Sequence, residues 1–110
     1  MNDDRSDMRL HAVALRRGDL WVVQCLEYDI ATQAQTISEL EESLLRLLAG
    51  HIELSRRNDE VPFSRLPKAP PSYWEKYHQV RSGFSDFHPL IIRDDIGTLA
   101  VNVSVGFATS

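Results

Sequence analysis

The sequence predicts an α+β domain with a mostly antiparallel sheet and one principal helix. Three patterns indicate this fold class. Residues 9–16 and 20–26 are rich in strand-forming side chains, and only Arg17-Gly18-Asp19 separates them, which favours an antiparallel hairpin. Residues 37–56 have the apolar spacing of one long helix. Residues 98–107 alternate apolar and polar side chains, which is the period of a strand with one buried face.

Length and charge narrow the functional classes. The chain has 110 residues, the length of one domain, and a net charge of −4. Because it has no basic stripe, direct binding to a DNA backbone is disfavoured. Cys25 is the single cysteine and cannot form an internal disulfide, which fits a reducing compartment. No apolar run is long enough to span a membrane, and the polar, acidic start is no signal peptide. We therefore expect a cytoplasmic protein with no membrane partner.

The first elements follow from local composition. Residues 1–8 are polar and acidic, and we expect them to be disordered. Residues 9–16 and 20–26 form the hairpin, and residues 30–35 give a weaker third strand with mixed alternation. These three segments therefore predict the antiparallel part of the sheet.

The principal helix begins at a capping box. Thr36 and Glu39 have the T-x-x-E spacing, and Ser38 with Glu41 repeats it two residues later, so the start is open between them. Gly50 costs about 1 kcal/mol against alanine in a helix and favours close approach of a neighbouring backbone. The apolar stripe is broad, so we expect a second covering surface, from a later segment or another subunit. Its residues are Leu40, Leu44, Leu45, Leu47, Leu48, His51, Ile52 and Leu54.

A proline-rich arm and a second helix come next. Residues 58–71 contain four prolines and should be extended and irregular. We expect the arm to lie over the exposed side of the long helix, held by the apolar anchors Val61, Phe63 and Leu66.

The second helix is expected over residues 72–83. A Ser72–Glu75 capping box marks its start and Gly83 its stop. The sequence does not assign residues 84–97: Pro89 argues against a central strand, although residues 90–92 could pair briefly. Residues 95–97 form a turn before the last strand, at 98–107.

Several side chains are of types that act in catalysis or metal binding. For each of them we prefer a structural role. His51 should be half-buried and hydrogen-bonded, with His78 and His88 on the surface, and no histidine pair has zinc-ligand spacing. Cys25 lies in an apolar strand and should be core. Glu27 and Asp29 are better placed than the other acids but isolated, while Asp3, Asp4, Asp7, Asp94 and Asp95 lie in polar or turn segments and should be solvated. We therefore predict no catalytic, cofactor or metal site, and not an enzyme.

Four aromatic residues are the candidate interface. Aromatic side chains are over-represented at interface hot spots, and Trp74 lies on a capped helix after the proline-rich arm. The alternative is that the arm uses these rings to dock on its own helix, because a small domain needs that buried area. The candidates are Trp21, Tyr73, Trp74 and Tyr77.

A family resemblance covers residues 18–54. Four segments follow one another in this range. They are the hairpin start Gly18-Asp19-Leu20-Trp21-Val22-Val23, the triplet Cys25-Leu26-Glu27, a polar strand ending at Gln35 and the helix start Thr36-Ile37-Ser38-Glu39-Leu40. Together they resemble the HicB family, the antitoxin half of HicA–HicB toxin–antitoxin pairs, and residues 99–105 fit its last strand. The resemblance implies a β-β-β-α-β sheet with the helix on one face, a partial and catalytically degenerate relative of the ribonuclease H fold.

The resemblance also implies a function. We expect a stand-alone HicB-like domain, without a C-terminal DNA-binding module, that neutralises a small RNA-cleaving HicA-like toxin by occlusion. It implies a homo-oligomer, a dimer or tetramer. The alternative is an orphan oligomeric scaffold or ligand-binding domain with no toxin. A third hypothesis, an RNA-processing enzyme, requires a carboxylate cluster that the sequence does not supply.

Overall fold

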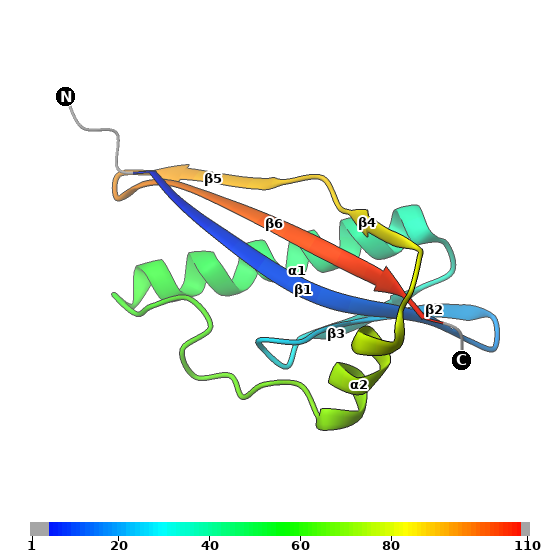
Figure 1. The fold of residues 1–110 in the computed structure, drawn as a ribbon. Coiled ribbons are helices and arrows are strands. Elements are labelled where there is room, and N and C mark those ends of the chain that lie inside the picture. Colours follow the sequence, from blue (N-terminus) through cyan, green and yellow to red (C-terminus); the bar gives the residue numbers. More distant parts are fainter. Residues whose placement is uncertain (1–4, 109–110) are drawn as a thin grey trace.

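The computed structural model describes residues 5–108 and shows an α+β fold: a mostly antiparallel six-stranded sheet and two helices, one of them long. Figure 1 shows the long helix running beside the two longest strands. The elements in chain order are β1 (Arg5–Arg17), β2 (Leu20–Cys25), β3 (Ala31–Ala34), α1 (Ile37–Arg57), α2 (Pro71–Gln79), β4 (Phe84–Asp86), β5 (Leu90–Asp94) and β6 (Gly97–Phe107).

Two long strands form the middle of the sheet. The strand order is β3-β2-β1-β6-β4, and β5 also pairs with β6. β1 and β6 run parallel, with Leu10 opposite Val103, while every other pairing is antiparallel. β4 and β5 therefore occupy successive parts of the same edge of β6, and Pro89 falls in the gap between them, where no ladder hydrogen bond is needed.

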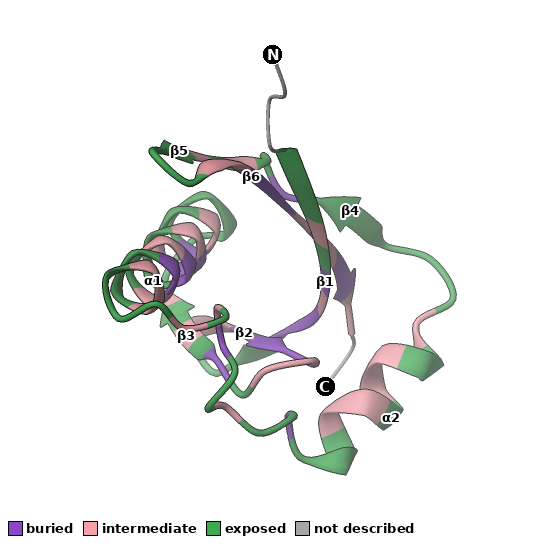
Figure 2. Ribbon diagram, turned by 90° about the vertical axis from the view of Figure 1, so that its left-hand side faces the viewer, coloured by how far each residue is buried: buried purple, intermediate pink, exposed green. Residues whose placement is uncertain are grey.

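The main core lies between α1 and the concave face of the sheet. Figure 2 shows the sheet curving around α1, with α2 on the other side. Four residues spaced one turn apart, Leu40, Leu44, Leu48 and Ile52, are fully buried on the inner side of α1. The sheet contributes Leu10, Ala12, Ala14, Val23, Cys25, Leu99, Val101, Val103 and Val105. A smaller cluster on the convex face joins Val13, Leu26 and Ala69 to the rings of α2.

The start of the long helix agrees with the sequence prediction. Thr36 is the N-cap, and its hydroxyl accepts a hydrogen bond from the backbone N–H of Glu39 at 3.1 Å. The earlier of the two possible capping boxes is therefore the one that is used. Leu40 and Leu44 are buried as predicted, but Leu47 is 38 % exposed.

The predicted disorder over residues 1–8 is wrong for its second half. Arg5 to Met8 belong to β1 and pair with Thr98 to Val101 of β6. A parallel partner this distant in sequence satisfies the backbone groups of a polar segment that has little apolar surface of its own. Residues 1–4 lie outside the described residues.

The second helix starts one residue earlier and ends four residues earlier than predicted. Pro71 occupies the first turn, where its missing N–H costs nothing. No side chain caps the helix, so the Ser72–Glu75 capping box is wrong. The helix ends at Gln79, before Gly83, which has a φ of 91° and sits instead at the entry to β4.

The proline-rich arm follows the β2–β3 connection instead of covering the exposed side of α1. The backbone N–H of Asp29 donates to the carbonyl of Pro67 at 2.7 Å, and that of Ala69 donates to Leu26 at 2.9 Å. Phe63 is buried as an anchor, but Val61 is 72 % exposed. The arm thus carries the chain from the concave side of the sheet to the convex side, where α2 lies.

Candidate protein-interaction surface

The outer side of α1 keeps an apolar strip that the described chain does not cover. Leu47 is 38 % exposed and Leu54 is 58 % exposed. A Cβ built on Gly50, between them, meets nothing within 4 Å. The close backbone approach that the sequence predicted at Gly50 is therefore absent from the contacts within residues 5–108.

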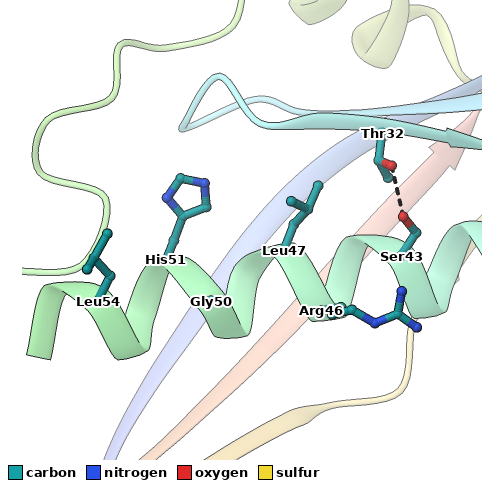
Figure 3. Close-up of a pocket in the computed structure, with 7 residues that line it drawn as sticks. All are labelled: Thr32, Ser43, Arg46, Leu47, Gly50, His51 and Leu54. Carbon is teal, nitrogen blue, oxygen red and sulfur yellow. Dashed lines mark hydrogen bonds between the residues drawn. The ribbon is translucent and has the colours of Figure 1, made fainter.

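This strip is one wall of a groove between α1 and β3, with a volume of about 400 Å³ (Figure 3). Its lining is mainly apolar, and polar side chains lie along it among the leucines (Figure 3). The lining residues are Thr32, Ser43, Arg46, Leu47, Gly50, His51 and Leu54.

The groove exists because the helix is much longer than the strand beside it. α1 has 21 residues, a length of about 31 Å, whereas β3 has 4 residues, about 13 Å. The hydroxyls of Thr32 and Ser43 lie 2.9 Å apart and join the two elements near the N-terminal half of α1 (Figure 3). Most of this side of α1 extends past the short strand β3.

His51 lies in the groove between Leu47 and Leu54 (Figure 3). It is half-buried, as predicted, and its ring lies 6.0 Å from that of Phe63, which stacks on Tyr28 at 4.8 Å. No side-chain hydrogen bond to His51 is formed within residues 5–108, which departs from the prediction. His51 thus connects the groove to an aromatic stack.

The four predicted interface aromatics lie on two faces. Tyr73, Trp74 and Tyr77 pack on the convex-face cluster. Trp21 packs on the concave side, 6.2 Å from Phe107 in an edge-to-face contact. The α2 rings therefore dock their helix, as the alternative interpretation expected, although they dock on the sheet and not on the long helix. Partner binding at these residues stays a prediction.

A polar cluster on the convex face was not found from the sequence. His11 Nδ1 lies 2.6 Å from Glu27, which also accepts from the His11 backbone N–H at 2.8 Å. The ring of His11 meets that of Tyr77 edge-on at 5.8 Å. Burial, with the nearby carboxylates of Glu27 and Asp86, raises the pKa of Tyr77. These contacts hold α2 to the sheet.

The same cluster continues along β1 and β6. Ser104 donates to Asp86 at 3.0 Å and accepts from Arg9 at 2.6 Å. His11 and Ser104 are register partners across the parallel pair, so their side chains share a face. The alternation of side chains along β1 and β6 shows which residues of each strand share a face. Only the parallel register of the two strands brings the residues of this cluster together.

The remaining chemically interesting residues serve structural contacts. Cys25 is fully buried, and this burial, with the negative charge of Glu27, raises the pKa of its thiol to about 12. Asp7 pairs with Arg5, Asp94 with Arg56, and Asp29 accepts from Gln24. His78 and His88 are exposed as predicted, and the backbone N–H of His88 donates to Glu41 at 2.7 Å.

No group of three or more potential ligand side chains is placed to hold a metal ion within residues 5–108. In the same range, no helix is long and apolar enough to cross a membrane. Asp3 and Asp4 lie outside this range.

Comparison with known proteins gave no match: no family model, curated protein or solved structure is significantly similar to the chain.

Proposed function

We propose that the protein is a non-catalytic, HicB-like antitoxin-type domain that neutralises a small RNA-cleaving toxin by occluding it. The order of elements carries this proposal. Strands β1, β2 and β3, helix α1 and strand β6 follow one another in the β-β-β-α-β order that the resemblance implies, with α1 on one face of the sheet. α2, β4 and β5 then form an insertion between α1 and β6.

Charge supports a basic partner. The chain has a net charge of −4, and a protein that cleaves RNA needs a positively charged surface to hold the phosphate backbone. Opposite net charges speed the encounter of two proteins and favour covering of the basic surface. Direct DNA binding forms no part of the proposal, for the same electrostatic reason. The buried, reduced Cys25 fits action in the cytoplasm.

An orphan oligomeric scaffold or ligand-binding domain is the second candidate. The groove between α1 and β3 favours it, because a partly open apolar groove can hold a ligand or another subunit without any toxin. The third hypothesis, an RNA-processing enzyme, would place its carboxylates at Glu27 and Asp29. Glu27 binds His11 and Asp29 binds Gln24, so both act in structural contacts.

The test is co-expression with the product of the adjacent gene, followed by affinity capture, light scattering and an RNA-cleavage assay. We expect a stoichiometric complex with a small basic protein and loss of its RNA cleavage. An unrelated basic RNA-binding protein of similar size is the control for non-specific attraction.

Two outcomes contradict the antitoxin proposal. Absence of a complex, with cleavage unaffected by the chain, would favour the orphan scaffold. Metal-dependent cleavage by the chain itself, abolished in Glu27→Ala or Asp29→Ala, would revive the enzyme hypothesis.

A further inference from the structure

We propose that the outer side of α1 is a homodimer interface, in which two copies of α1 pack antiparallel about a two-fold axis beside Gly50. The occupant of the groove is thus a second copy of this chain. The resemblance implies a homo-oligomer, and this inference adds the face and the orientation of the contact. It does not rest on the proposed function, because self-association needs no toxin.

The spacing of the uncovered strip is the first argument. Ser43, Leu47, Gly50 and Leu54 recur at alternating intervals of four and three residues, the repeat of a helix-to-helix seam. None of the four is fully buried. The helix therefore has a second packing seam besides its buried side, and Gly50 leaves its centre open to another backbone.

Charge complementarity selects a second copy in antiparallel orientation. Arg46 and Glu53 are equidistant from the midpoint between Ala49 and Gly50. A two-fold axis at that midpoint places Arg46 of each copy opposite Glu53 of the other, which makes the pairing twice. A parallel, in-register arrangement would instead put each Arg46 at the level of the other Arg46 and away from Glu53, so this pairing would be lost.

Two further charges obey the same symmetry. Glu42 and Arg57 are also equidistant from that midpoint, so the axis brings these opposite charges together as well. All four side chains belong to exposed residues. Within residues 5–108, none of the four takes part in an ion pair.

The groove has room for side chains of such a partner. Its volume of about 400 Å³ can receive leucine side chains of the second α1 beside Leu47 and Leu54. A basic toxin fits this face less well, because Arg46 and Arg57 there balance the acidic residues Glu42 and Glu53. A surface whose charges complement one another about a two-fold axis suits an isologous contact.

The experiment compares charge variants by analytical ultracentrifugation. We expect wild-type protein to dimerise, and Arg46→Glu and Glu53→Arg each to weaken the dimer about tenfold or more by opposing like charges. Mixing the two variants should restore a dimer, because each copy then supplies charges that the other lacks. The double variant, with both changes in one chain, should also dimerise. Leu54→Glu, at an exposed site, should be monomeric.

The controls separate this interface from effects within one helix. The same charges are spaced for Glu42–Arg46 and Glu53–Arg57 pairs inside a single helix, but intrahelical pairing cannot make a mixture associate when its components do not. Glu75→Arg, an exposed charge change on α2, is the matched control and should leave the dimer intact. Circular dichroism checks that every variant is folded.

Each remaining outcome overturns the proposal. The proposal would be overturned if the wild-type protein were a monomer at about 100 µM, a concentration at which proteins with weak interfaces still associate. A dimer that persists in the single charge variants, or a mixture that stays monomeric, would also overturn it. A wild-type monomer that loses capture of the adjacent gene's product on Leu54→Glu would assign the groove to that partner.

Discussion

Asp94 joins the end of β5 to the last turn of α1. Its carboxylate pairs with Arg56 and accepts from the backbone N–H groups of Ile96 and Gly97 at 2.9 and 3.3 Å. The hydrogen bond from Arg56 is the main cause that lowers the pKa of Asp94 below its usual value of 3.8. The contact closes the turn before β6 and fixes it to the helix.

Replacing Asp94 with asparagine should destabilise the fold in a pH-dependent way. Because the folded-state pKa is the lower one, the ionised carboxylate stabilises the fold fully above the usual value of 3.8 and less as pH falls through the folded-state pKa. In urea unfolding at pH 7, the wild type should have a higher free energy of unfolding than Asp94→Asn. This difference should become smaller in acid. Asp95→Asn is the adjacent control. A difference that stays constant with pH would show that the charge plays no part.

Cys25 should be chemically silent in the folded protein. Burial, with the nearby negative charge of Glu27, raises the pKa of its thiol to about 12, and only the thiolate reacts. We expect a thiol reagent at pH 8 to modify it at least about a hundredfold more slowly than in denatured protein, following the thiolate fraction and access. Rapid labelling of native protein would mean that the strand opens.

At the residue scale, the sequence predicted those features that depend only on neighbouring residues. The burial of Cys25 and the cap at Thr36 follow from their neighbours in sequence. The contact of His11 with Glu27 does not, because it depends on how β1 and the end of β2 are placed in space. Ser104 joins that cluster only through the parallel register of β1 and β6.

At the scale of the element, α1 shows how one helix divides its leucines between two environments. Leu44 is fully buried and Leu47, three residues on, is 38 % exposed. Leu44→Ala should therefore cost about 2–5 kcal/mol of unfolding free energy, from lost burial and the cavity left behind. In dilute protein, Leu47→Ala should cost less than about 1 kcal/mol, since a surface change leaves no cavity. Chemical denaturation measures both, and equal losses would mean that the helix face is misassigned.

Elements with strong periodicity were predictable. Of the edge elements, only the brief pairing of residues 90–92 was anticipated. β2, α1, β6 and the apolar part of β1 each have a clear apolar pattern, so their positions follow from sequence. The polar start of β1, Arg5 to Met8, does not. β4 and β5 are short and largely exposed, and they exist because β6 offers them a free edge. The bounds of α2 depend on Pro71 and on docking, not on the capping box that the sequence suggested.

At the scale of the whole molecule, one sheet separates two cores. The larger lies under α1 and the smaller under α2. The proline-rich arm connects them around the β2–β3 connection. The broad stripe of α1 was correctly interpreted as more than one sheet face needs, but the sequence could not show that the later chain would go to the opposite face. That route leaves the outer side of α1 uncovered.

We expect the two cores to unfold locally and independently of each other. A substitution at Gly106 tests this. A Cβ built there lies 3.1 Å from Phe84, 3.3 Å from Tyr77 and 3.3 Å from Val80. Gly106→Val therefore adds bulk where α2 and β4 meet β6, and overpacking of this kind costs about 1–3 kcal/mol. Hydrogen exchange should show faster exchange in residues 71–86, while α1 keeps its protection because its buried side faces the other core.

The matched control for that experiment is Gly50→Ala on α1, where the added methyl meets nothing within 4 Å. It should leave exchange in residues 71–86 unchanged. In dilute protein it should also stabilise α1 by up to about 1 kcal/mol, because alanine favours a helix interior over glycine. If Gly106→Val instead accelerates exchange evenly through both helices, the two faces unfold as one unit. The sheet would then transmit the strain from α2 to α1, and the smaller core would be part of the larger one.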